Sequence, residues 1–177
     1  QALQLTVIDV RGIEDRPSTL ELNGESSEVD AFMPLVLINP EIKPLNEAVT
    51  GPEGCLSFPE IYADISRPES VEVRALNRKG EPFEFRCGGL LARAVQHEAD
   101  HLNGILFIDR MSKADKADLK PELDELQAET KAARHSRARR FLKGQTKSRT
   151  PEVSKPSANS TGEYSVPRGI WRRYGVR

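Results

Sequence analysis

The 177-residue chain predicts an α+β fold, with antiparallel β-sheets around one central helix and a basic C-terminal extension that is partly helical and partly disordered. Three observations lead to this fold class. Short β-branched stretches separated by turn residues fill the first half of the chain, and one amphipathic helical pattern follows them. The last third is rich first in Ala, Lys, Glu and Arg and then in Ser, Thr and Pro, with few apolar residues.

Composition indicates one domain of ordinary size with an extension. Apolar residues make up 37% of the chain, which is low for a compact domain, and charged residues make up 30%. No stretch approaches the roughly 18 consecutive apolar residues of a membrane span, so we expect no membrane partner. Two cysteines cannot form a disulfide framework and favour a reducing compartment, so we expect a cytoplasmic protein.

Residues 3–10 predict the first strand because they are apolar and β-branched. Residues 12–30 are polar and contain the turn signal Asn23-Gly24, so they predict a loop or a loose hairpin. Residues 33–38 predict a second strand, and we expect Asn39-Pro40 to end it.

Residues 71–76 and 82–85 predict a β-hairpin. The first stretch alternates apolar and polar residues, as half-buried strands do, and the second returns after a turn over residues 77–80. Farther along, residues 105–108 are apolar and predict a short strand. The segment around Cys55 predicts only a short connection from a loop into a strand.

Residues 90–102 predict the central helix, because four apolar residues recur at helical spacing: Leu91, Ala94, Val95 and Leu102. Asn103-Gly104 is a typical C-terminal cap and should end this helix. A second helical region over residues 112–145 is expected in two pieces, because Pro121 interrupts it.

The chain is expected to divide into a domain over residues 1–111, a charged helix over 112–145 and a disordered basic segment over 146–177. Charge divides the chain as well. Acidic residues outnumber basic ones by 12 in residues 1–130, and basic residues outnumber acidic ones by 11 in residues 131–177. A basic segment of this kind favours contact with a polyanion, and a solvated segment without a dedicated partner is the plain alternative.

The strongest chemical signal is His97-Glu98-Ala99-Asp100-His101 on the expected central helix. Histidines four residues apart lie one turn apart on the same face, so both rings can reach a single cation. Glu98 follows the first histidine directly, where its carboxylate can take a proton from a water that the cation activates. This pattern predicts a hydrolytic metal site, against the simpler interpretation of two histidines on one helix by chance.

A catalytic site of this type needs a third protein ligand. A histidine six residues beyond the second is excluded, because Phe107 stands there. The candidates farther along lie in a highly charged helix or beside arginines, which disfavours them: Glu122, Glu125, Glu129 and His135. Cys55 offers a thiolate, a strong ligand for a borderline cation. A free cysteine is also typical of a small buried residue, so the residues alone leave the third ligand open.

Two motifs, in this order, resemble the peptide deformylase family. Glu53-Gly54-Cys55-Leu56-Ser57 and Gln96-His97-Glu98-Ala99-Asp100-His101 match the family's second and third motifs at every defined position. The similarity extends from about residue 3 to residue 111. It implies that Cys55, His97 and His101 hold one divalent cation, Fe²⁺ in the cell, with Zn²⁺, Ni²⁺ or Co²⁺ accepted.

The resemblance also implies the reaction, which is hydrolysis of the N-formyl group from the initiator methionine of a new polypeptide, with release of formate. Glu98 would accept the proton of the attacking water and then protonate the leaving amine. The backbone N–H of Leu56 would donate to the developing oxyanion. The expected partners are nascent formyl-Met polypeptides, and the protein is expected to be a monomer.

The family's first motif, a glycine-rich run of the form GxGxAAxQ, has no match in this chain. Its glutamine helps to hold the oxyanion in the family. We therefore expect the chain to begin after that motif, with the domain over residues 1–111 truncated at its N-terminus. The alternative function is a catalytically inactive deformylase-like protein that binds peptide or the ribosome.

Three further expectations concern residues outside the catalytic roles. In the family a basic C-terminal helix can bring the enzyme to the ribosome, and residues 131–149 hold eight basic and no acidic residues, so we expect contact with the ribosome or its RNA. Asp100 is expected to pair with Arg67 behind the metal ligands. Cys87 has no partner motif and is expected to be structural.

Overall fold

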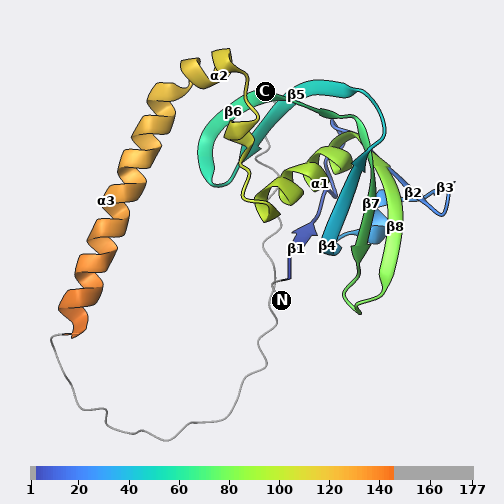
Figure 1. Cartoon of the computed structure of the whole chain (residues 1–177), viewed down its shortest axis with the longest axis horizontal. Helices are drawn as coiled ribbons and strands as arrows, with labels where there is room; N and C mark the ends of the chain where they lie inside the picture. Colours follow the sequence, from blue (N-terminus) through green and yellow to red (C-terminus); the bar gives the residue numbers. More distant parts are fainter. Residues whose placement is uncertain (1–2, 146–177) are drawn as a thin grey trace, which may run out of the picture.

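Antiparallel strands and one central helix form the body of the protein, which confirms the α+β prediction. The computed structural model describes residues 3–145 (Figure 1). The strands in chain order are β1 (Leu5–Ile8), β2 (Ser18–Leu22), β3 (Glu25–Ser26), β4 (Leu35–Pro44), β5 (Ala48–Cys55), β6 (Phe58–Pro68), β7 (Ser70–Leu76) and β8 (Pro82–Gly88). The α-helices are α1 (Gly89–Leu102), α2 (Lys113–Asp118) and α3 (Lys120–Gln145), and the 3-10 helices are η1 (Val29–Phe32) and η2 (Phe107–Asp109).

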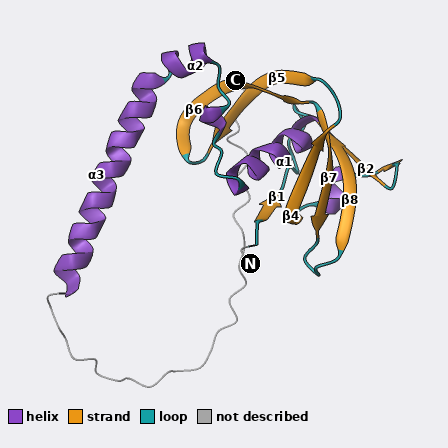
Figure 2. Ribbon diagram, in the orientation of Figure 1, coloured by secondary structure: helices purple, strands orange, loops and turns teal. Residues whose placement is uncertain are grey.

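Two sheets hold α1 between them (Figure 2). The larger sheet has six strands in the order β1–β4–β7–β8–β2–β3, and all neighbouring strands are antiparallel. β5 and β6 form a separate two-stranded sheet that curves over α1. The main core lies between α1 and the larger sheet, and its most deeply buried side chains are Ile8, Leu37, Val71, Val73, Leu91 and Val95.

Both predicted hairpins are present. β2 and β3 pair around Asn23-Gly24, where both residues adopt a positive φ. β7 and β8 pair from Ser70 to Leu76, and the Gly80 N–H donates to the Asn77 carbonyl to close their turn. Part of the segment over residues 12–30, predicted as a loop or a loose hairpin, thus joins the larger sheet, because β2 pairs with β8.

The predicted end of the second strand is wrong, because β4 continues past Asn39-Pro40 to Pro44. Asn39 adopts a φ of 50°, and the pairing register with β7 shifts between Ile38 and Glu41. This irregularity is a β-bulge, one of the few places where a sheet tolerates a proline that cannot donate to the ladder. The strand therefore bends at this point instead of ending.

The predicted strand over residues 105–108 is also wrong, because η2 begins at Phe107 instead. The Leu106 N–H donates to the Asp109 carboxylate at 2.9 Å and closes a tight turn. Phe107 is fully buried in a second cluster together with Ile61, Ile65 and Met111. Phe107 is apolar because it packs in this cluster. Buried turns and buried strands both contain apolar residues, so a short apolar stretch does not distinguish them.

The hairpin of β5 and β6 is much longer than the short connection that the sequence indicates. β5 contains Gly51, Pro52 and Gly54, residues with low strand propensity, yet its ladder with β6 runs from Ala48 to Gly54 before a register shift. Gly54 is needed here, because an added Cβ would lie 2.7 Å from the ring of Tyr62. Tertiary pairing therefore overrides local propensity.

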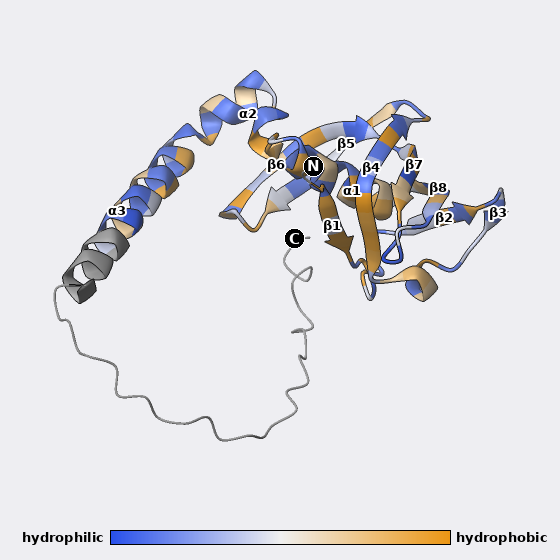
Figure 3. Ribbon diagram, turned by 60° about the horizontal axis from the view of Figure 1, so that its bottom comes forward, coloured by the Kyte–Doolittle hydropathy of each residue, from blue (hydrophilic) through white to orange (hydrophobic). Residues whose placement is uncertain are grey.

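The C-terminal helical region breaks into two pieces, as predicted. α2 ends at Asp118, and Pro121 lies in the first turn of α3, where its missing N–H is harmless. Leu119, Leu123 and Leu126 pack against the second cluster, and beyond them α3 extends away from the body and is mostly hydrophilic (Figure 3). Within residues 3–145 no helix is long and apolar enough to span a membrane. The basic segment over 146–177 lies outside the described residues.

We expect Gly89→Ala to destabilise the protein far more than Gly80→Ala, as measured by equilibrium unfolding in urea. Both glycines have a positive φ, but an added Cβ at Gly89 would lie 2.1 Å from the Pro17 carbonyl oxygen, whereas nothing lies within 4 Å at Gly80. The Gly80 variant should lose about 1 kcal/mol and the Gly89 variant at least about 3 kcal/mol. Equal losses would contradict the close approach of residue 17 to the start of α1.

Candidate metal centre

The structure brings Cys55, His97 and His101 together. Cys55 ends β5, and the two histidines lie one turn apart on α1. The ligand atoms of the three side chains lie within 4.8 Å of one another, and Cys55 Sγ is 3.3 Å from His101 Nε2. The two imidazole rings meet edge to face, with centroids 4.5 Å apart. Two distant segments of the chain thus present three donors to one point.

This donor set fits a divalent cation of borderline softness. One thiolate and two imidazoles suit zinc and other first-row metals. Bonds of about 2.3 Å to sulfur and about 2.0 Å to nitrogen place donor atoms roughly 3.5 Å apart around a tetrahedral ion, close to the 3.3 Å between Cys55 Sγ and His101 Nε2. Three protein donors leave a fourth position for water or substrate, as in catalytic zinc sites.

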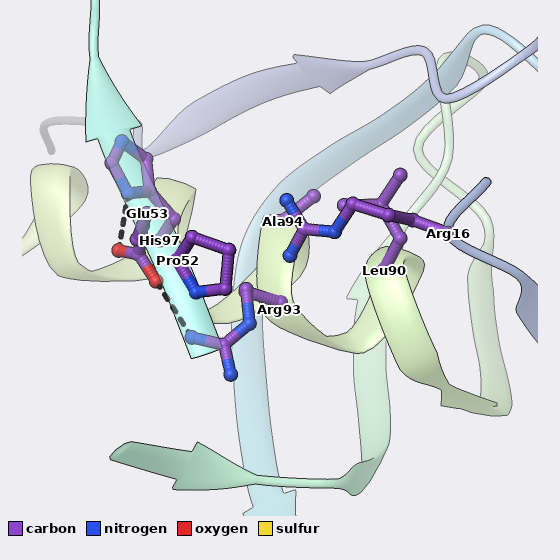
Figure 4. A pocket seen from close by; sticks show the side chains of 7 residues that line it. All are labelled: Arg16, Pro52, Glu53, Leu90, Arg93, Ala94 and His97. Atoms are coloured by element: carbon purple, nitrogen blue, oxygen red, sulfur yellow. Dashed lines mark hydrogen bonds and ion pairs between the residues drawn. The ribbon is translucent and has the colours of Figure 1, made fainter. Parts of the chain in front are cut away.

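Glu53 orients His97 from behind. The Glu53 Oε1 atom lies 2.7 Å from His97 Nδ1, and both side chains are buried (Figure 4). A carboxylate in this position accepts the Nδ1 proton, which leaves the Nε2 lone pair for a metal ion. Glu53 therefore selects the tautomer that a metal ligand requires.

The negative charge of Glu53 is stabilised by two buried arginines. Arg67 donates to both carboxylate oxygens at 2.8 and 2.6 Å, and Arg93 donates at 3.2 Å. Burial alone would raise the pKa of Glu53, but the bonds from Arg67 and His97 outweigh burial and hold the pKa at about 2. Glu53 is therefore ionised throughout the range in which a metal ligand must be deprotonated.

Asp100 continues this network on the far side of Arg67. Arg67 donates to Asp100 at 2.8 Å, as the sequence predicts, and Arg110 donates to the same carboxylate with its Nε at 2.6 Å. Burial alone would raise the pKa of Asp100, but the bonds from Arg110 and Arg67 outweigh it and lower the pKa. The network thus runs from His97 to the segment that leads into α2.

Arg93 ties α1 to the hairpin of β5 and β6. Its guanidinium donates to the carbonyl oxygens of Val49 on β5, at 3.1 Å, and of Ile65 on β6, at 2.9 Å. Figure 4 shows Arg93 and Glu53 at the edge of a small pocket lined by Arg16, Pro52, Glu53, Leu90, Arg93, Ala94 and His97. One side chain therefore fixes both hairpin strands and the carboxylate behind the candidate ligand.

The two candidate ligands Cys55 and His97 affect each other's ionisation. Burial alone would raise the pKa of Cys55, but hydrogen bonds with His97 and Ser57 outweigh burial and lower it. Burial alone would lower the pKa of His97, but its contacts with Cys55 and Glu53 raise it to about 9. Without a cation these surroundings therefore favour a Cys55 thiolate beside a protonated His97, and a cation bound by both would take the place of the imidazole proton.

The predicted catalytic residues lie next to the three donors in the chain. Glu98 follows His97 on α1, is half-buried, and accepts a hydrogen bond from the Thr6 hydroxyl at 3.1 Å. Leu56 follows Cys55 in the turn between β5 and β6, and its side chain is 60% exposed. The Leu56 side chain therefore contributes little to the packing of the body.

The other candidates from the sequence lie elsewhere. Four of them are exposed on α3, outside the group of three donors: Glu122, Glu125, Glu129 and His135. Cys87 is buried in the main core, and burial raises its pKa to about 12, which agrees with a structural role. Among the described residues, Cys55 is therefore the third donor that joins the histidine pair.

Sequence reasoning missed Arg93 and Arg110, and it gave no role to Glu53, which it identified only as part of a motif. Arg93 interrupts the apolar run of α1 and is 9% exposed, so a charged residue at an inward helical position was the available signal. Arg110 follows the turn of η2 and carries no pattern of its own, because its partner Asp100 lies ten residues earlier on α1. Neither contact follows from spacing alone.

Comparison with known proteins gives one consistent result. The family model for polypeptide deformylase matches residues 2–117. A peptide deformylase of Opitutus terrae is 45% identical over 133 residues, which cover 74% of this chain and 69% of that protein. Peptide deformylase 1 of Bacillus subtilis is 47% identical over 102 residues, 58% of this chain and 60% of that protein.

Solved structures agree with the sequence matches. A mutant form of Arabidopsis thaliana peptide deformylase 1B superposes with a TM-score of 0.60 at 38% identity, over 75% of this chain and 65% of that chain. This chain therefore spans only about half to two thirds of the length of the proteins it matches.

Glu53→Gln is expected to weaken metal binding about 10- to 100-fold, because the amide no longer selects the His97 tautomer and no longer balances Arg67. Competition with a chromophoric chelator measures the affinity, and circular dichroism checks that the fold is retained. The matched control is Glu84→Gln, which removes an exposed ion pair with Arg74 and should leave metal affinity unchanged. A Glu53→Gln protein that binds the metal as tightly as the control would refute the orienting role.

Proposed function

The chain belongs to the polypeptide deformylase family, and we propose that it removes the N-formyl group from the initiator methionine of newly synthesised polypeptides and releases formate. The observation that carries this proposal is the meeting of Cys55, His97 and His101, with Glu98 beside them on α1. A thiolate and two imidazoles that leave one coordination position open, with a carboxylate adjacent in the chain, suit metal-assisted hydrolysis.

The residues divide the reaction among them. Cys55, His97 and His101 would hold a divalent cation, which would supply Lewis-acid activation of a water. Glu98 would accept a proton from the attacking water and then give a proton to the leaving amine. The backbone N–H of Leu56 donates to the oxygen on which negative charge develops. Glu53 keeps His97 in the ligand tautomer throughout.

Ferrous iron is the cation that we propose for the cell, and Zn²⁺, Ni²⁺ and Co²⁺ suit the same donors. The methionine side chain is proposed to enter the pocket of Figure 4, because Pro52, Leu90 and Ala94 give it apolar walls directly beside His97. Both cysteines are free thiols, which fits a reducing compartment, and we propose a monomeric protein of the cytoplasm.

Ribosomal RNA is the proposed partner of the C-terminal region. α3 begins with the acidic residues Glu122, Asp124 and Glu125, and eight basic residues with no acidic one follow in residues 131–149. Acidic residues near the start of a helix interact favourably with its dipole. Lys131 and Arg134 are exposed on α3, beyond the part that packs on the body, so a polyanion can contact them without rearrangement of the domain.

Glu98→Ala should keep the metal and lower formate release from formyl-Met peptides by about 10²–10⁴-fold, because a general base is removed. Cys55→Ala should lose both metal and turnover. Metal analysis and a formate assay on the full chain measure the two effects, with Glu25→Ala as an exposed control far from α1 in the chain. Turnover retained by Glu98→Ala would refute its proton-transfer role, and a metal-bound chain without turnover would support the alternative of a deformylase-like binding protein.

Removal of residues 131–177 should abolish salt-dependent pelleting with ribosomes, because binding by basic residues releases counterions and weakens as salt rises. A sharper pair of variants neutralises charge without shortening α3. Lys131→Gln with Arg134→Gln should weaken pelleting, and Glu122→Gln with Glu125→Gln should not. Equal pelleting by all variants would remove the ribosome from the proposed partners.

A further inference from the structure

Thr6 is a polar residue at a position where the strand pattern calls for an apolar one. Along β1 the side chains alternate between exposed and buried, and Thr6 and Ile8 are the two that face inward. Thr6 is only 7% exposed, and its paired residue on β4, Leu37, is fully buried. Valine has nearly the same shape and would bury no hydroxyl, so packing alone does not account for threonine here.

The hydroxyl of Thr6 has a specific partner on α1. Its Oγ1 donates to the Glu98 Oε2 atom at 3.1 Å, across 92 positions of sequence. β1 lies beside α1, and the two elements are in contact (Figure 1). A buried hydroxyl normally costs free energy unless it is hydrogen-bonded, and a bond to a carboxylate is stronger than one to a neutral group.

We propose that Thr6 is a positioning residue, which holds one oxygen of the Glu98 carboxylate and leaves the other oxygen for the reacting water. This inference rests on the proposed function of Glu98 as the proton acceptor. Within residues 3–145, Thr6 is the side chain that hydrogen-bonds Glu98, so the carboxylate depends on this one contact for its orientation.

The chemistry explains why one contact matters. A glutamate side chain has three rotatable bonds, and Glu98 is only half-buried, so packing fixes its carboxylate weakly. A general base must lie within hydrogen-bond reach of the proton that it removes. Thr6 sits on a strand of the main sheet, whose neighbours Ile8 and Leu37 belong to the rigid core, so it offers a fixed point to which a mobile carboxylate can bond.

Thr6→Val tests this role in the metal-loaded full chain with formyl-Met peptides. It should lower kcat about tenfold and leave KM and metal content unchanged, because a hydrogen bond to a charged group is lost while the volume is kept. Thr6→Ser retains a hydroxyl and should restore kcat to within about twofold. The matched control is Thr19→Val, the same change on the exposed side of β2, which should have no effect. A Thr6→Val enzyme with unchanged kcat would overturn the proposal.

A second measurement does not depend on turnover. Urea unfolding of Thr6→Val, Glu98→Ala and the double variant forms a double-mutant cycle. The shifts in the unfolding midpoint should be non-additive, with Thr6→Val producing a smaller shift once Glu98 is already alanine. Additive shifts would overturn the proposal, because they would mean that the two side chains do not interact in solution.

The two measurements separate this inference from the proposed function. If the unaltered chain releases no formate and the double-mutant cycle is non-additive, the assigned reaction is wrong, but the interaction between Thr6 and Glu98 is supported. If formate is released and the cycle is additive, the reaction stands and the positioning role is wrong.

Discussion

The buried carboxylate of Glu53 is the interaction on which the rest of the site depends. It joins three elements of the fold: β5, which carries it, β6, which carries Arg67, and α1, which presents His97. A buried charge is tolerated only when its partners are complete, so removal of any one partner leaves an uncompensated charge in the core. The position of the candidate ligand His97 therefore depends on this ion network.

The network also explains how elements without catalytic residues contribute to the site. Arg93 donates hydrogen bonds to backbone carbonyl oxygens of the hairpin of β5 and β6 and so fixes it against α1. Cys55, at the end of β5, thereby lies opposite the two histidines. Arg110 reaches back from the turn after α1 to Asp100, so the start of the C-terminal region is bonded to the helix of the site. The donors themselves occupy a small part of the chain, and the surrounding charges fix their geometry.

The sequence predicts those features that depend on local spacing. The two histidines four residues apart, the hairpin of β7 and β8 and the cap at Asn103 all follow from patterns within about ten residues. The length of β5, the bulge after Ile38 and the buried turn at Phe107 depend on pairing or packing with distant residues, and local propensity gives no warning of them. The contacts of Arg93 and Arg110 could not be predicted for the same reason, because only the fold brings their partners near them.

The central claim is that one thiolate and two imidazoles bind the same cation, and X-ray absorption spectroscopy of the metal-loaded full chain tests it most directly. One sulfur neighbour at about 2.3 Å and two imidazole nitrogens at about 2.0 Å are predicted around the metal. A metal surrounded by nitrogen and oxygen alone, with no sulfur at bonding distance, would show that Cys55 is not a ligand and would contradict the claim.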